Sequence, residues 1–229
     1  MLRRILTCFS LFFNLIRVNW QIIKGVWRIS TIPQPIVSIF GGARLPKETH
    51  YLEKVHELAE RFTSHAISVI TGGGSGVMEA ANRGAQKPMG ARGKSVGIGV
   101  KNVTTEPNKF VEIYFEVDYF FARKWLLTRY SQAFVIFPGG LGTLDELSEV
   151  LTLMMTKKLQ PVPIMLVGIK YWKDLMIWME KEAVEYGLID KKYLEQLTLT
   201  DDLELVFNTI HSTCSISHNN KNGPTHSYK

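Results

Sequence analysis

AFVIFPGGLGTLDE, at residues 133–146, joins a buried strand to the glycine-rich start of a helix. The apolar run 133–137 predicts the strand, and the helix is expected to begin near Thr143, beside two acidic residues. Such a turn leaves backbone N–H groups of the helix N-terminus unpaired at one edge of a sheet, with a carboxylate next to them. The stretch therefore predicts a phosphate-binding turn with an acid or base beside it.

A second segment repeats this order of strand, glycine turn and helix. Residues 67–70 predict the strand, TGGGSG at 71–76 the turn, and VMEAAN at 77–82 the start of the helix. The turn departs from the dinucleotide-binding fingerprint, which requires Gly or Ala where Val77 stands. Taken alone it is equally consistent with tight packing. Two such turns in one small domain favour a nucleotide-sized ligand.

Strand and helix patterns alternate through the middle of the chain. Strands are expected at 36–40, 67–70, 95–100, 111–117, 133–137 and 162–167, and helices at 48–64, from 77, at 119–131, 143–157 and 171–186. With 229 residues and 45% hydrophobic content, the chain can bury one full core. We therefore predict a single Rossmann-like α/β domain with a doubly wound parallel sheet, which binds its ligand at the carboxyl ends of the strands.

The N-terminal segment differs in charge from the rest of the chain. Residues 1–30 hold five basic residues and no acidic one, which accounts for most of the formal net charge of +6. The remainder is nearly neutral, so nucleic-acid binding is not expected. Arg17 interrupts the apolar run, which disfavours a membrane span. We expect an amphipathic helix that lies on a membrane surface or on a partner subunit, or that packs on its own domain.

Pro33 and Pro35 mark the end of this segment. The expected division is an N-terminal segment at 1–32, the α/β domain at 33–211, and a disordered polar tail at 212–229. Cys8 and Cys214 stand near opposite ends of the chain, so neither a disulfide framework nor a metal site is expected. This cysteine usage suits a reducing cytoplasm, with contact at the inner membrane surface as a further option for the N-terminal segment.

Three motifs, in this order, carry a resemblance to a known family. GGGSGVMEAANRGA at 72–85, FFARK at 120–124 and PGGLGTLDE at 138–146 resemble those of the Lonely Guy (LOG) family, and the similarity extends over residues 36–190. Its members, once labelled lysine decarboxylases, hydrolyse nucleoside 5′-monophosphates, including cytokinin riboside monophosphates, to free base and ribose 5-phosphate. The resemblance implies a Rossmann-like homodimer with no metal and no redox cofactor.

The resemblance also implies which residues act. It makes Arg123 and Glu146 catalytic. The substrate contacts that the resemblance implies are Glu106, Lys124, Gly139, Gly140, Leu141, Gly142, Thr143, Leu144 and Thr152. We expect two glycines of the second turn, Gly73 and Gly74, to contact the substrate as well. Cytokinin-activating plant members have Met-His where this chain has Phe121 and Ala122. This departure resembles the bacterial branch and favours AMP-like nucleotides over cytokinins.

The residues themselves fit this chemistry. Breaking an N-ribosidic bond develops positive charge on the ribose, which Glu146 could stabilise while it orients or deprotonates water. Arg123 would hold the phosphate or hydroxyls, or support the departing base. One alternative is a carrier protein, which would bind a nucleotide or a molybdenum-cofactor-like ligand without converting it. Another is a decarboxylase, which requires a lysine in a Schiff base with pyridoxal phosphate; Lys124 beside an arginine does not suffice for this.

Overall fold

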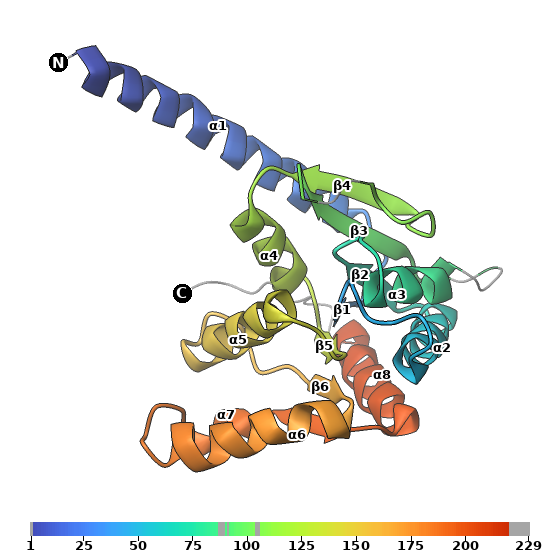
Figure 1. Cartoon of the computed structure of the whole chain (residues 1–229). Helices are drawn as coiled ribbons and strands as arrows, with labels where there is room; N and C mark the ends of the chain where they lie inside the picture. Colours follow the sequence, from blue (N-terminus) through green and yellow to red (C-terminus); the bar gives the residue numbers. More distant parts are fainter. Residues whose placement is uncertain (1, 87–89, 91, 104–105, 220–229) are drawn as a thin grey trace.

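The structure, a computed structural model, describes residues 2–86, 90, 92–103 and 106–219. Its centre is one sheet of seven strands in the order β4-β3-β2-β1-β5-β6-β7, in which neighbouring strands run parallel (Figure 1). The strands are β1 (Ile36–Phe40), β2 (Ser68–Thr71), β3 (Ser95–Val100), β4 (Ile113–Val117), β5 (Ala133–Ile136), β6 (Ile164–Val167) and β7 (Leu197–Thr200). The predicted α/β, doubly wound parallel fold is confirmed.

Helices cover both faces of the sheet. The chain forms α1 (Leu2–Ser30), α2 (His50–Ser64), α3 (Val77–Gln86), α4 (Phe120–Arg129), α5 (Leu141–Met155), α6 (Ile169–Trp178), the π-helical turn η1 (Met179–Val184), α7 (Lys191–Leu194) and α8 (Leu203–Asn219). One hydrophobic core lies between the sheet and α2, α3 and α8, and the other between the sheet and α4, α5, α6 and the end of α1. Strands that are buried on both sides explain why the sequence shows continuous apolar runs at β5 and β6.

The strand order reverses between β1 and β5. From β1 the chain winds outward through β2 and β3 to β4, and then returns to the other side of β1 and winds through β6 to β7. The loops that follow β1 and β5 therefore leave the sheet toward opposite faces. In an open α/β sheet a crevice forms at this position, and ligands bind there.

The described side chains of helix α1 that contact the domain lie in its C-terminal half. Ile29 is buried in the core beside Ile22 and Val26, whereas the apolar side chains at positions 9–16 are exposed. Figure 1 shows α1 projecting well beyond the sheet. In the described part of the chain, no helix is both long enough and apolar enough to cross a membrane.

The C-terminal part of the domain was not fully predicted. We expected disorder from residue 212, but α8 continues to Asn219, so this expectation is wrong for residues 212–219. Phe207, Ile210 and Cys214 lie on one face of α8 and are buried against the domain, which holds the helix in place. Residues 220–229 lie outside the described part. Strand β7 and the short α7 were also missing from the predicted elements.

Candidate functional site

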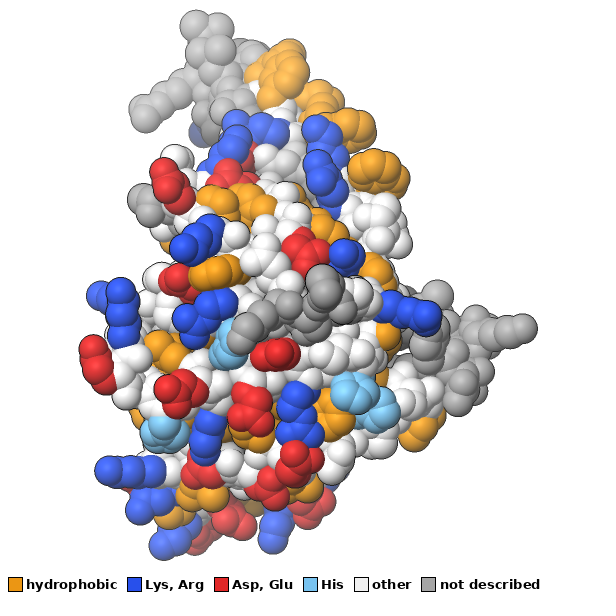
Figure 2. Space-filling model, turned by 90° about the vertical axis from the view of Figure 1, so that its right-hand side faces the viewer, with side chains coloured by type: hydrophobic (Ala, Val, Ile, Leu, Met, Phe, Trp, Pro, Cys, Tyr) orange, Lys and Arg blue, Asp and Glu red, His pale blue; other side chains and the backbone are white. Residues whose placement is uncertain are grey.

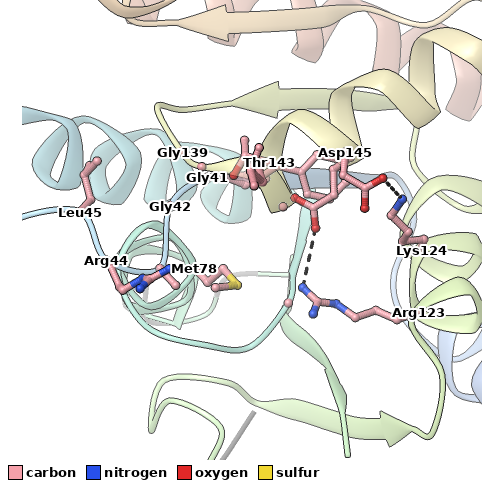
Figure 3. Close-up of a pocket in the computed structure, with 18 of the residues that line it drawn as sticks. Gly41, Gly42, Arg44, Leu45, Met78, Arg123, Lys124, Gly139, Thr143 and Asp145 are labelled. Atoms are coloured by element: carbon pink, nitrogen blue, oxygen red, sulfur yellow. Dashed lines mark ion pairs between the residues drawn. The ribbon is translucent and has the colours of Figure 1, made fainter. Parts of the chain in front are cut away.

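A cavity of about 590 Å³ lies at the point where the strand order reverses. Its walls come from the loops after β1 and β5, the start of α5, and parts of α3, α4 and α6 (Figure 3). Its lining residues are Ile39, Phe40, Gly41, Gly42, Ala43, Arg44, Leu45, Gly72, Met78, Phe120, Arg123, Lys124, Gly139, Gly140, Leu141, Gly142, Thr143, Asp145, Glu146 and Tyr171. The volume is within the usual range of small-molecule sites.

The turns after β1 and β5 lie directly against each other. The backbone N–H of Gly42 donates a hydrogen bond to the carbonyl oxygen of Pro138 at 2.9 Å. A methyl group on Gly42 would stand 3.2 Å from the Cα atom of Gly139, and one on Gly139 would overlap the Thr143 hydroxyl. The Tyr171 hydroxyl donates to the carbonyl oxygen of Gly139 from the α6 side. Glycine is needed here because two backbones and a side chain meet with no room for a Cβ atom.

The start of α5 is open toward the cavity. Gly140 occupies the N-cap position and has no side chain to cap the N–H groups of the first turn. A methyl group on Gly140 or Gly142 would have no described neighbour within 4 Å, and both glycines line the cavity. Unpaired N–H groups and the positive end of the helix dipole favour negative charge, so the start of α5 is suited to bind an anion.

Arg123 of α4 and Glu146 of α5 both line the cavity and form an ion pair there, which Figure 3 marks with a dashed line from Arg123. Arg123 Nη2 lies 3.7 Å from Glu146 Oε1, and the two side chains are only 13% and 16% exposed. Burial raises the pKa of Glu146 to about 7, against the opposing effect of Arg123. Burial also lowers the pKa of Arg123, and Glu146 counteracts this. The cavity therefore holds a carboxyl group that is more basic than usual. The nearby guanidinium limits the rise of its pKa, so that the group can ionise at neutral pH.

The second glycine turn, at 71–76, packs against the side chain of Arg123. A methyl group on Gly72 would overlap the Arg123 guanidinium, so the side chain occupies the space that the missing Cβ leaves. Gly73 has a positive φ of 71°, and a Cβ there would stand 3.0 Å from the Tyr114 ring. This turn thus combines a packing function with placement of a cavity residue.

Gly72→Ala is expected to reduce activity about tenfold, because the added methyl group pushes the guanidinium away from Glu146. The overlapping group is the end of a flexible side chain, so the free energy of unfolding should change by less than about 1 kcal/mol. Gly74→Ala is the matched control, since a methyl group there meets only Met78. Steady-state kinetics and thermal unfolding of both variants check this. Equal activities would mean that Arg123 tolerates displacement.

Two side-chain amides, one of them fully buried, hold the second turn in place. Asn82 accepts hydrogen bonds from the Thr71 hydroxyl at 2.7 Å and from Asn108 Nδ2 at 3.0 Å. Asn108 Nδ2 also donates to the carbonyl oxygens of Gly73 and Gly74. These two glycines were predicted to contact substrate, but they are not among the described residues that line the cavity. Their observed contacts fit the packing interpretation of this turn.

The other predicted site residues fall into two groups. Arg123, Lys124, Glu146 and all five residues from 139 to 143 line the cavity. Glu106, Leu144 and Thr152 are not among its described lining residues; Leu144 packs against the core, and the other two are exposed. Lys124 Nζ lies 2.8 Å from carboxylate oxygens of both Asp145 and Glu149 and so ties α4 to α5.

One wall of the cavity was missed from the sequence. The loop Gly41–Leu45 follows the central strand β1, and its Arg44 is exposed in the cavity on the side away from Arg123 (Figure 3). Two glycines directly after a buried strand were the available signal. Met78 and Tyr171 carried no such signal, because their places in the cavity depend on how α3 and α6 pack.

Within the described part of the chain, no group of three or more His, Cys, Asp or Glu side chains is arranged to hold a metal ion. Cys214 is a free cysteine whose burial raises its pKa to about 12. The side chain of Cys8 lies outside the described part.

Comparisons with known structures agree with the fold. The molybdenum cofactor binding protein from Rippkaea orientalis is 23% identical, with a TM-score of 0.58 over 78% of this chain and 96% of that one. The molybdenum cofactor carrier protein from Chlamydomonas reinhardtii is 21% identical, with the same TM-score over 80% and 99%. At these identities the likeness concerns the fold alone.

Comparisons of sequence are more specific. The model of a family described as possible lysine decarboxylase matches residues 78–210, more than half of the chain. A probable cytokinin riboside 5′-monophosphate phosphoribohydrolase, LOG6 of Arabidopsis thaliana, is 28% identical over 67% of this chain and 76% of its own length. The corresponding probable enzyme LOGL3 of Oryza sativa subsp. japonica is 31% identical over 66% and 71%. Together with the three sequence motifs at 72–85, 120–124 and 138–146, these matches show that the chain belongs to the LOG family.

Proposed function

We propose that this protein hydrolyses the N-glycosidic bond of nucleoside 5′-monophosphates to give free base and ribose 5-phosphate. The observation that carries the proposal is the largely buried Glu146 carboxylate beside Arg123, on the same helix whose uncapped first turn opens to the cavity. The names of the curated relatives, at 28% and 31% identity, support this class of reaction.

The geometry of α5 suits a ribose 5-phosphate. Gly142 and Glu146 are four residues apart and therefore lie on the same face of the helix, about 6 Å apart along its axis. A phosphate bound by the N–H groups at the start of α5 would place the attached ribose next to the carboxylate. Binding energy from the phosphate is then used to position the bond that breaks.

The two charged side chains have complementary roles in this proposal. Ionised Glu146 would stabilise the positive charge that develops on the ribose and accept a proton from the attacking water. A pKa of about 7 makes it a stronger base than an ordinary carboxylate. Arg123 remains charged, so it would bind phosphate, sugar hydroxyls or the departing base and not donate a proton.

We further propose a homodimer that acts in the cytoplasm on AMP-like nucleotides. Phe121 and Ala122 stand where the cytokinin-activating members have Met-His. In the structure Phe121 is exposed and Ala122 is buried at the start of α4, next to Arg123. Glu106 and Thr152 are exposed in a single chain, so a role in substrate contact would require a further element to reach them.

Lys124 weighs against a decarboxylase. It is the one lysine among the described residues that line the cavity. Burial acts to lower its pKa, but hydrogen bonds from its ammonium group to Asp145 and Glu149 outweigh this and raise it. A Schiff base requires an uncharged amine with freedom to move, and these ion pairs oppose both conditions.

The test is a panel of nucleoside 5′-monophosphates and matched nucleosides without phosphate, incubated with the purified protein and followed by chromatography of the free base. Release from monophosphates alone would support the proposal and identify the preferred base. Tight binding without release would instead favour a carrier, the function named for the Chlamydomonas reinhardtii protein of similar fold.

Gly140→Ala is expected to raise KM about tenfold for a nucleoside 5′-monophosphate, because its methyl group occupies the open space at the start of α5. The free energy of unfolding should stay within about 0.5 kcal/mol of wild type, since no described atom lies within 4 Å of that methyl group. Kinetics and thermal unfolding measure the two effects. An unchanged KM would place the phosphate elsewhere.

A further inference from the structure

Helix α1 carries an uninterrupted stripe of exposed apolar side chains. The stripe consists of Phe9, Phe12, Phe13, Ile16, Trp20, Ile23 and Trp27, and each of them is at least 50% exposed. Successive members are one, three or four residues apart, which places them on one face of the helix. The stripe runs along most of the described length of α1.

The stripe faces away from the domain. Ile22, Val26 and Ile29 pack into the core, and at 100° per residue they lie on the side of α1 opposite Trp20 and Trp27. The side chain of Gln21 accepts a hydrogen bond from the backbone N–H of Asp118 at 2.8 Å. The domain thus holds α1 by one face and leaves the apolar face uncovered in a single chain.

Basic residues border the stripe on one side. Arg17, Lys24 and Arg28 fall on adjacent helical positions between the stripe and the packed face. Arg17 pairs with Asp118 at 2.6 Å, and Lys24 Nζ lies 5.2 Å from the centre of the Trp20 ring. Figure 2 shows orange side chains in a row at the top of the molecule, with blue side chains beside them. Residues 1–30 hold no acidic residue; Asp118 of the domain neutralises Arg17, which leaves Lys24 and Arg28 as the net positive charge of this border.

The stripe could be covered by a second copy of α1 or by a lipid surface, and the charge pattern favours the lipid surface. A second copy of α1 would bring its own basic residues close to these and add repulsion between like charges. An anionic lipid surface would accept the apolar face and attract the basic border together, with tryptophans at the interface. We propose that α1 lies along an anionic membrane surface and buries the stripe of Phe9 to Trp27 in it. The domain then stands on the side of the helix that faces water.

The test is sedimentation of the full-length protein with vesicles of phosphatidylcholine alone and of phosphatidylcholine mixed with phosphatidylserine. We expect binding to the anionic vesicles, weaker by at least tenfold in the double variant Phe13→Ser and Ile16→Ser. The matched control, Leu11→Ser with Leu15→Ser, removes exposed apolar side chains that lie off the stripe and should bind like wild type. Circular dichroism checks that both variants remain helical.

The basic border is tested separately. Lys24→Ser with Arg28→Ser should weaken binding to the anionic vesicles about 25-fold, because each basic residue near such a surface contributes roughly fivefold. Equal binding to both kinds of vesicle, or none to either, would overturn the proposal. So would a change of oligomeric state in the stripe variant without a change in vesicle binding, since the stripe would then lie between copies. None of these outcomes bears on base release, so this proposal and the proposed enzymatic function fail independently.

Discussion

Glu146→Gln is expected to lower kcat for base release from nucleoside 5′-monophosphates by about 100- to 10,000-fold. The substitution keeps the size of the side chain in its place beside Arg123 but removes the negative charge that opposes the developing charge on the ribose. KM should change little, because the phosphate is held by the start of α5 and not by this residue. Steady-state kinetics with chromatography of the released base separates the two parameters.

Glu180→Gln is the control for this prediction. It removes one carboxylate from the exposed surface of the turn η1 and leaves the described lining of the cavity unchanged. Its kcat should match that of wild type. A Glu146→Gln protein that kept more than about a tenth of the wild-type kcat would show that this carboxylate is not the catalytic group.

The parts of the fold that the sequence predicts best are those set by local pattern. Strands at 36–40 and 95–100 have the predicted bounds, because both are buried along their whole length and read as unbroken apolar or small-residue runs. The turn at 138–146 also has the predicted form, a helix start behind a buried strand. Such features depend on neighbours in sequence, which a single chain displays directly.

The parts that depend on packing were harder to predict. The loop Gly41–Leu45 becomes a wall of the cavity only because β1 pairs with β5, whose residues are nearly one hundred positions away. The three carboxylate partners of Arg123 and Lys124 on α5 could not be assigned to them without the placement of α4. The end of α8 looks polar in sequence, yet the buried Cys214 belongs to a packed face that stabilises the helix.

The orientation of α1 illustrates the same limit. The sequence predicts an amphipathic helix but leaves open what its apolar residues contact. They fall on two faces, and the structure assigns one to the core and the other to the surface. The sequence left three contacts open for α1: a membrane surface, a partner subunit and its own domain. The division into two faces shows which side chains to substitute in order to test the membrane proposal.

Glu146→Gln is also expected to stabilise the protein, by an amount that depends on pH. Burial raises the pKa of Glu146 in the folded protein to about 7, above the ordinary value of 4.5. A group of this kind favours folding below its unfolded pKa, and that contribution is lost as the pH rises through the folded pKa. The wild type therefore loses stability between about pH 4.5 and pH 7, whereas the neutral amide does not. The gain from the substitution should be about 2 to 3 kcal/mol larger at pH 8 than at pH 5.

Thermal unfolding of wild type and Glu146→Gln at both pH values measures this difference. For a chain of this size, the gain at pH 8 corresponds to a rise in Tm of about 5 to 10 °C, with much less at pH 5. Glu180→Gln should show no comparable dependence, because its carboxylate is exposed in the folded protein. A variant that is inactive and more stable at pH 8 would mean that the carboxylate is held in an unfavourable setting for its chemistry. If the two proteins unfolded alike at both pH values, Glu146 would carry its charge without cost, and the raised pKa on which its role as a base depends would be wrong.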